Sequence, residues 1–201
     1  MSQILEAIPG PVLEDVPTDG TAVEVPRLAR HQITLSDGHQ VGITVAGRGI
    51  PLIVVHGFSA EGFLYAQTLS RLVLMGFKVI AIDTANHGGT QGLPSDGQNL
   101  NAYSDLLGRI IDELGIESCV LAGHSMGGRL VTQLAAQRPE RTISVLLIDA
   151  IVGDTWDRMV YAFRLVPGLL PLIGGALIAD SLFVVPVLSD PKQAVKFLRL
   201  A

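Results

Sequence analysis

The stretch Cys119-Val120-Leu121-Ala122-Gly123-His124-Ser125-Met126-Gly127-Gly128 decides the fold of this chain. Its first residues form a short apolar run typical of a buried strand, and the residues after Ser125 begin a helical pattern that stops at Pro139. Between the two lies Gly-x-Ser-x-Gly, the pattern of a sharp strand-to-helix turn that presents a serine hydroxyl above the edge of a sheet. The sequence therefore predicts that Ser125 is a nucleophile.

The glycines around Ser125 match what such a turn requires. The residues two before and two after the nucleophile must be almost without side chains, because larger ones would collide across the turn. Gly123 and Gly127 occupy these places, and Gly128 allows the helix to pack close to the strand. The helix N-terminus then faces the site, so its backbone N–H groups favour a developing oxyanion. The alternative, a glycine-rich turn with an incidental serine, is disfavoured by the flanking strand and helix and by the additional glycine.

Further apolar runs and helical patterns lie on both sides of this stretch. We expect strands at 31–36, 40–46, 51–55, 78–83, 118–122 and 143–149. A turn at 36–39 joins the first two of them. The spacing of apolar residues predicts helices at 63–75, 100–114 and 126–138. This alternation indicates an α/β fold: a mostly parallel sheet with helices on both faces and the leading hairpin as an antiparallel edge.

A second loop, after the predicted strand at 51–55, contains His56, Gly57 and Phe58. When a serine lies on a turn of the kind described above, the loop after this earlier strand provides the second oxyanion donor. We therefore predict that the N–H groups of Phe58 and Met126 bind the oxyanion, with Gly57 as part of the same binding loop. His56 itself is interpreted as a structural loop histidine and not as a base.

Composition and charge exclude several classes of protein. With 48% hydrophobic and 16% charged residues the chain is expected to fold, and its net charge of −5 argues against a nucleic-acid surface. A single cysteine, Cys119, excludes an internal disulfide framework and any multi-cysteine metal site. No P-loop and no convincing dinucleotide fingerprint occurs, so we expect neither a cofactor nor a metal. The N-terminus shows no signal-peptide pattern, and a cytoplasmic location is expected.

On three sets of residues the chain resembles the α/β-hydrolase fold superfamily, in its branch of serine esterases and lipase-like acyl hydrolases. They are His56-Gly57-Phe58, Asp83-Thr84-Ala85-Asn86-His87-Gly88 and Gly123-His124-Ser125-Met126-Gly127-Gly128, in the family's order over roughly residues 31–150. The middle loop departs from the family pattern, because Asn86 stands where relatives usually have a glycine. Serine as the nucleophile argues against dehalogenase and epoxide hydrolase activity, for which relatives use aspartate at this place.

The resemblance also implies a catalytic acid and a histidine that follow the nucleophile along the chain. The five histidines are His31, His39, His56, His87 and His124. None follows Ser125, so the usual catalytic base is absent from this chain. Asp149, at the end of the predicted strand 143–149, is one candidate for the acid, and an aspartate with only a structural role is the alternative.

Three regions are expected: an extended N-terminal lead-in at 1–30, an α/β-hydrolase core at 31–152, and the start of a helical cap or lid at 153–201. The segment 165–188 is apolar and long enough for a membrane span. Its three prolines and the lack of a flanking Lys/Arg cluster favour cap helices around an apolar pocket, so membrane contact is possible but not favoured. Relatives continue through the cap to further strands, and the simplest account is a chain truncated at its C-terminus.

The sequence thus predicts a serine hydrolase that cleaves an ester or related acyl bond of a small apolar substrate, through Ser125 and a backbone oxyanion hole. The alternative is a non-catalytic or truncated module of the same fold that binds a small apolar ligand. A third interpretation is a fragment whose exposed sheet edge pairs with another chain. The sequence leaves the substrate and the oligomeric state open.

Overall fold

The computed structural model describes residues 27–58, 62–94, 99–166, 168 and 172 of the 201-residue chain. The chain divides into two compact units, Met1–Val152 and Gly153–Ala201. Most of the predicted lead-in at 1–30 and most of the predicted cap at 153–201 lie outside the described residues. The described part of the first unit contains the sheet and the predicted nucleophile.

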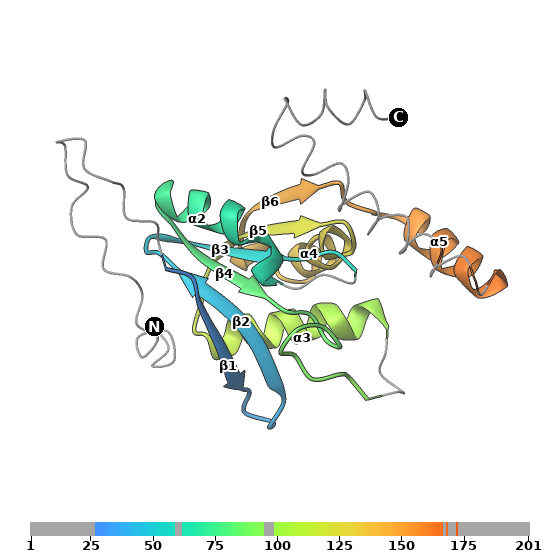
Figure 1. Ribbon diagram of the computed structural model, residues 1–201, viewed down its shortest axis with the longest axis horizontal. Coiled ribbons are helices and arrows are strands. Elements are labelled where there is room, and N and C mark those ends of the chain that lie inside the picture. The colour runs from blue at the N-terminus through green and yellow to red at the C-terminus, as the bar shows by residue number, and fades with distance from the viewer. Residues whose placement is uncertain (1–26, 59–61, 95–98, 167, 169–171, 173–201) are drawn as a thin grey trace, which may run out of the picture. The chain divides into compact units, whose positions relative to one another are not determined.

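A six-stranded sheet in the order β1-β2-β4-β3-β5-β6 forms the first unit. The strands are β1 (Ala29–Thr34), β2 (Gln40–Ala46), β3 (Ile50–Val55), β4 (Phe77–Ile82), β5 (Cys119–His124) and β6 (Thr142–Ile148). β2 pairs antiparallel with both β1 and β4, whereas β4, β3, β5 and β6 are parallel (Figure 1). The predicted mostly parallel sheet with an antiparallel leading hairpin is confirmed.

Helices cover both faces of this sheet (Figure 1). The helical elements of the first unit are the 3₁₀-helix η1 (Gly62–Tyr65), α2 (Ala66–Leu74), α3 (Leu100–Glu113), α4 (Met126–Gln137) and the 3₁₀-helix η3 (Pro139–Arg141). On one face, Leu69 and Val73 of α2 join a buried cluster with Leu52, Val79 and Ala81 of β3 and β4. Side chains alternate along a strand, so the intervening residues point to the opposite face, where α3 and α4 pack against each other.

The helix boundaries follow from local chemistry. Asn99 precedes α3, and its side-chain oxygen accepts a hydrogen bond from the Ala102 N–H at 2.9 Å, which caps the helix. Gly115 follows α3 with a φ of 63°, a left-handed conformation that glycine adopts without a steric cost. The helix predicted at 63–75 is present in two pieces, η1 and α2, which meet at Tyr65.

The two edges of the sheet differ in character. At one edge, β1 carries the polar side chains Arg30, Gln32 and Thr34 on exposed positions. At the other edge, β6 leaves Ile143, Leu146 and other apolar residues between 36% and 55% exposed, on both faces of the strand. A strand that is apolar on both faces has the pattern of a buried central strand.

The described element of the second unit is α5 (Asp154–Leu165). Gly153 precedes it with a φ of 67°, and Asp154 and Asp157 lie in its first turn, where negative charge stabilises a helix N-terminus. Among the described residues no helix is both long and apolar enough to cross a membrane. The apolar segment at 165–188 lies almost entirely outside them.

Candidate active site

Ser125 lies between β5 and α4, at the carboxyl ends of the parallel strands. Its φ of 52° and ψ of −115° fall in a region that residues with side chains rarely adopt. The predicted strained turn is therefore present. Within the described part of the chain the Ser125 hydroxyl has no hydrogen-bond partner, so it is not engaged in a structural contact.

The close packing around this turn explains its glycines. A methyl group added at Gly123 would overlap the backbone of Gly127, and one added at Gly127 would overlap the carbonyl oxygens of Val55 and His56. A methyl group added at Gly128 would overlap the side chain of Ala150, two residues after the end of β6. The turn therefore packs backbone against backbone with the end of β3, as the Gly-x-Ser-x-Gly pattern predicts.

The loop after β3 passes directly over the nucleophile turn. Val55 is paired in register with Gly123, which brings the ends of β3 and β5 together. A Cβ atom added at Gly57 would lie 3.0 Å from His124 Nδ1 and 3.2 Å from Ser125 Cβ. Gly57 thus provides close approach, while its own N–H donates to the Tyr65 hydroxyl over 3.5 Å. The Gly57 N–H is therefore directed at Tyr65, and the binding role predicted for Gly57 stays a prediction.

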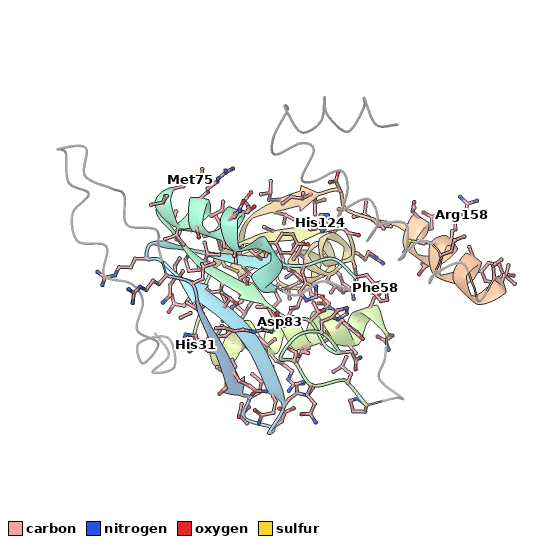
Figure 2. All side chains as sticks on the ribbon, in the orientation of Figure 1. His31, Phe58, Met75, Asp83, His124 and Arg158 are labelled. Atoms are coloured by element: carbon pink, nitrogen blue, oxygen red, sulfur yellow. The ribbon has the colours of Figure 1, made fainter. Side chains whose placement is uncertain are left out.

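The two predicted oxyanion donors are the residues that directly follow Gly57 and Ser125 in the chain. Phe58 comes directly after Gly57, and Met126 comes directly after Ser125 as the first residue of α4. Figure 2 shows Phe58 and His124 at the same end of the sheet. Phe58 is 52% exposed, and its ring meets the His87 ring edge-on at a centroid distance of 5.9 Å, which places an apolar surface beside the candidate oxyanion site.

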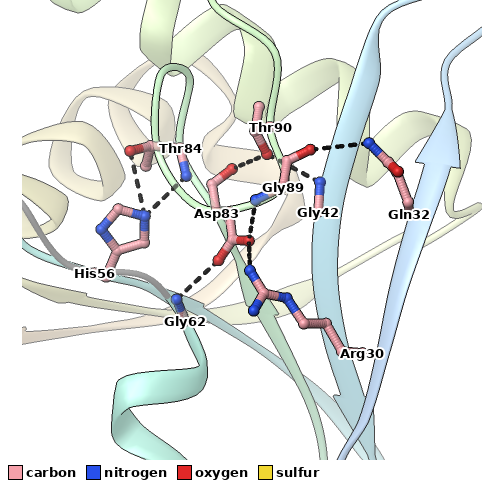
Figure 3. Close-up of polar contacts among 9 residues, drawn as sticks. All are labelled: Arg30, Gln32, Gly42, His56, Gly62, Asp83, Thr84, Gly89 and Thr90. Atoms are coloured by element: carbon pink, nitrogen blue, oxygen red, sulfur yellow. Dashed lines mark hydrogen bonds and ion pairs between the residues drawn. The ribbon is translucent and has the colours of Figure 1, made fainter.

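His56 is fully buried and both of its ring nitrogens have partners. Its Nδ1 lies 2.7 Å from the Gly57 carbonyl oxygen, and its Nε2 accepts a hydrogen bond from the Thr84 N–H at 2.9 Å (Figure 3). These partners require a neutral ring with the proton on Nδ1. His56 therefore links the loop after β3 to the loop after β4, in agreement with its interpretation as a structural histidine.

Asp83 organises the loop that follows β4 (Figure 3). Its buried carboxylate accepts hydrogen bonds from the Gly62 N–H at 2.8 Å and the Gly89 N–H at 2.9 Å, and Arg30 forms an ion pair with it at 3.2 Å. Charged hydrogen bonds of this kind are stronger than neutral ones. Asp83 therefore holds the start of η1, and the loop beside the site, against the sheet.

Asn86 accounts for the departure from the family pattern in this loop. Its φ of 64° lies in the left-handed region, which asparagine tolerates better than most residues with a side chain. Its side-chain amide donates to the Tyr103 hydroxyl at 3.0 Å. Asn86 therefore adopts the conformation expected of the missing glycine and adds a contact that glycine would lack.

None of the five histidines, all of which are described, forms a hydrogen bond with Ser125. His87 Nδ1 lies 2.9 Å from the Ala85 carbonyl oxygen, and His124 Nδ1 lies 2.9 Å from the Tyr65 hydroxyl. His39 contacts a backbone oxygen far from the site. A serine nucleophile needs a base that accepts its proton, and none of these hydrogen bonds connects a histidine to Ser125 for that purpose.

Asp149 lies at the end of β6, beside the nucleophile turn, with a φ of 44°. The Ser125 N–H donates to the carbonyl oxygen of Ile148 at 3.0 Å, and the Ile151 N–H donates to the carbonyl oxygen of Ser125 at 3.3 Å. The exposed carboxylate of Asp149 has no hydrogen bond or ion pair among the described residues. The candidate acid is thus adjacent to the turn but does not orient a histidine.

Tyr65 is the residue at this site that the sequence did not identify. It lies at the junction of η1 and α2, and its ring meets the His124 ring edge-on at a centroid distance of 5.8 Å. Burial raises the pKa of the Tyr65 hydroxyl, so the hydroxyl keeps its proton at neutral pH. No motif marks this tyrosine, because its partner lies 59 residues further along the chain.

The described residues offer no metal site, since they contain no group of three or more His, Cys, Asp or Glu side chains that could hold an ion. Cys119 is buried at the start of β5, and burial raises the pKa of its thiol to about 11. A thiol with such a pKa is almost entirely protonated at neutral pH and is a poor nucleophile. Among these groups Ser125 is therefore the candidate nucleophile.

The comparisons with known proteins agree on one family for this chain. The model of a family described as "alpha/beta hydrolase fold" matches residues 50–167. A protein of Mycobacterium phage D29 that carries the name non-heme haloperoxidase is 41% identical over 61% of this chain and 44% of its own length. An sn-1-specific diacylglycerol lipase of Mus musculus, ABHD11, is 32% identical over 57% of this chain and 38% of its own length. The chain therefore spans less than half the length of these curated relatives.

Solved structures show the same fold. A bacterial membrane phospholipase A superimposes with a TM-score of 0.58 and 24% identity, over 62% of this chain and 40% of the other. The thioesterase domain from the curacin biosynthetic pathway gives a TM-score of 0.57 and 21% identity, over 69% of this chain and 53% of the other. At these identities the likeness concerns the architecture alone.

Proposed function

Because the chain belongs to the α/β-hydrolase fold family, we propose that it is a serine hydrolase acting on an ester or related acyl bond of a small apolar substrate. The observation that carries the proposal is the backbone of Ser125, whose φ of 52° and ψ of −115° place a hydroxyl that has no hydrogen-bond partner among the described residues at the carboxyl ends of the strands. Strain of this kind persists only where the surrounding structure enforces it, and it is concentrated at functional sites.

In the proposed reaction the Ser125 oxygen forms a bond to the carbonyl carbon, and the carbonyl electron pair moves onto the oxygen. The N–H groups of Phe58 and Met126 bind this oxyanion, and the N-terminus of α4 adds a favourable dipole. As the oxyanion collapses, the bond between the carbonyl carbon and the alcohol or thiol breaks, and this leaving group takes up, by way of solvent water, the proton that Ser125 gives up. A further water molecule then releases the acyl group from Ser125. The exposed Phe58 ring supports an apolar substrate, because it extends an apolar surface beside the oxyanion donors.

The Ser125 proton requires a base, and none of the five histidines, all of them described, forms a hydrogen bond with Ser125. We therefore expect the chain to react with strongly electrophilic acyl or phosphonyl compounds and to turn over ordinary esters slowly. Asp149 is the proposed acid, since it lies next to the nucleophile turn and its carboxylate has no hydrogen bond or ion pair among the described residues. The names of the mouse relative, a lipase, and of one structural neighbour, a thioesterase, fit acyl chemistry.

A second candidate function is the binding of a small apolar ligand without catalysis. The observation in its favour is the same lack of a histidine in contact with Ser125. It differs from the first in one respect that can be measured: ligand binding should survive Ser125→Ala, and no covalent adduct should form at this position.

The deciding experiment is covalent labelling with a fluorophosphonate, read by intact mass and by mapping of the modified peptide. The wild-type chain and Ser144→Ala, which changes an exposed serine on β6, should each gain one adduct, and Ser125→Ala should gain none. Absence of labelling in a folded, monodisperse wild-type sample would reject the hydrolase proposal in favour of ligand binding. Labelling of Ser125→Ala at the wild-type rate would reject Ser125 as the nucleophile.

A further inference from the structure

A single hydroxyl group contacts both loops that carry the proposed oxyanion donors. Tyr65 Oη lies 2.9 Å from His124 Nδ1 in the nucleophile turn and 3.5 Å from the Gly57 nitrogen in the loop after β3. Gly57 directly precedes Phe58, and only Ser125 separates His124 from Met126. Tyr65 therefore contacts the chain one residue before the Phe58 donor and two residues before the Met126 donor.

The direction of the hydrogen bonds follows from the donors and acceptors present. The Gly57 N–H can only donate, so Tyr65 Oη accepts from it. The hydroxyl proton of Tyr65 is then available for His124 Nδ1, the other polar atom in contact with it. A neutral His124 that accepts at Nδ1 holds its proton on Nε2. With this tautomer of His124, Gly57, Tyr65 and His124 form a continuous chain of hydrogen bonds in one direction.

The position of this hydroxyl is fixed by packing. The Tyr65 ring packs against the buried cluster between α2 and the sheet, and the first residue of α2 follows it directly. Leu69 and Val73 anchor α2 in the same cluster and are almost completely buried. The hydroxyl is consequently held by a rigid element that belongs to neither of the two loops.

We propose that Tyr65 is a positioning residue that sets the distance between the Phe58 and Met126 N–H groups by tying the loop after β3 to the nucleophile turn. The inference rests on the proposed function. Without the hydroxyl, the Gly57 N–H loses its acceptor and His124 loses the donor that selects its tautomer. The Gly57 backbone is then held only through its carbonyl oxygen, by the hydrogen bond from His56 Nδ1, and the separation of the two oxyanion donors is less firmly set.

The test compares Tyr65→Phe, which removes only the hydroxyl, with Tyr103→Phe, which removes a hydroxyl that also accepts one hydrogen bond but contacts neither loop. The kinetic readout is fluorophosphonate labelling of Ser125, separated into the probe's binding constant and its maximal rate. Removal of a whole oxyanion donor costs about 10²- to 10³-fold in rate. Because both donors remain, we expect Tyr65→Phe to lower the maximal rate about tenfold with an unchanged binding constant. Tyr103→Phe should leave both quantities at their wild-type values.

Two nuclear magnetic resonance readouts do not depend on activity. In the wild-type chain, long-range ¹⁵N–¹H spectra of the neutral form of His124 should show its proton on Nε2, and the Gly57 amide should be protected from hydrogen exchange. Tyr65→Phe should give a mixture of His124 tautomers and faster exchange at Gly57. Tyr103→Phe should change neither.

These readouts separate failure of the inference from failure of the proposed function. If the wild-type chain does not label at all but Tyr65→Phe changes the His124 tautomer and the Gly57 exchange rate, the hydrolase function fails and the positioning of the two loops by Tyr65 stands. If the wild-type chain labels and Tyr65→Phe labels at the same rate, the inference is wrong. It is equally wrong if Tyr65→Phe leaves both the tautomer and the exchange rate unchanged.

Discussion

Ser125 and Asp149 occupy the ends of neighbouring strands, and the backbone of Ser125 is hydrogen-bonded to Ile148 and Ile151 on either side of Asp149. Both residues have a positive φ, 52° for Ser125 and 44° for Asp149. The conformation of the nucleophile turn is therefore coupled to that of the chain leaving β6. Changes at Asp149 should reach Ser125 through the backbone even though their side chains form no hydrogen bond.

Asp149→Val should lower the free energy of unfolding by about 1–2 kcal/mol, because a β-branched residue is strained at a left-handed φ. Asp149→Gly also removes the carboxylate but accepts this φ, so it should unfold at the wild-type urea concentration or slightly above it. Urea denaturation followed by circular dichroism measures both. Equal loss of stability in the two variants would show that the carboxylate, and not the backbone, is responsible.

Gly127→Ala should destabilise the fold by about 2 kcal/mol or more, because the added methyl group overlaps the carbonyl oxygens of Val55 and His56 in a region of backbone-to-backbone packing. Gly168→Ala is the control, since no described residue lies within 4 Å of its added Cβ. Thermal unfolding of the two variants would give the comparison. An unchanged melting temperature for Gly127→Ala would contradict the close approach of the nucleophile turn to the end of β3.

Asp83→Asn should lower the free energy of unfolding by about 2–3 kcal/mol, because hydrogen bonds to a charged group are strong and a buried donor loses its partner. The control is Asp37→Asn, which removes a surface carboxylate paired with Arg109 and should leave the unfolding curve unchanged. Chemical denaturation at pH 7 measures both variants. Similar curves for Asp83→Asn and the wild-type chain would mean that Asp83 does not organise the loop.

Cys119 should be inert in the folded chain and reactive in the unfolded one. Burial raises the pKa of its thiol from 9.0 to about 11, so this group stabilises the fold fully below pH 9, and its contribution is lost as the pH rises toward 11. Reaction with a chromogenic disulfide at pH 8, with and without urea, measures the difference. Rapid stoichiometric reaction without urea would contradict the buried position.

The sequence predicted the elements of the core because each follows from a local pattern. Strands β3 to β6 are apolar runs, and the predicted helix at 126–138 differs from α4 (Met126–Gln137) by a single residue. The nucleophile turn was predictable for the same reason. Gly123, Ser125 and Gly127 lie within five consecutive residues, and close packing requires glycine at the two outer positions.

Contacts between distant segments could not be predicted in this way. Tyr65 reaches His124 only because α2 packs on one particular face of the sheet, and no spacing in the sequence encodes that. The fit of Asn86 into its loop likewise depends on a left-handed backbone and on Tyr103, which lies 17 residues further along the chain. The hydrogen bond from the Gly57 N–H to the Tyr65 hydroxyl depends on the same packing of distant segments.

The unequal edges of the sheet have a consequence for symmetry. Strand pairing between β6 of one molecule and β1 of the next would be head-to-tail and could repeat without limit, which is the geometry of a filament. The polar and charged side chains exposed on β1, among them Arg30 and Gln32, disfavour that contact. Pairing of β6 with β6 instead relates two molecules by a twofold axis and uses up both apolar edges at once. Any association of this chain through its sheet should therefore close at pairs and not grow into fibres.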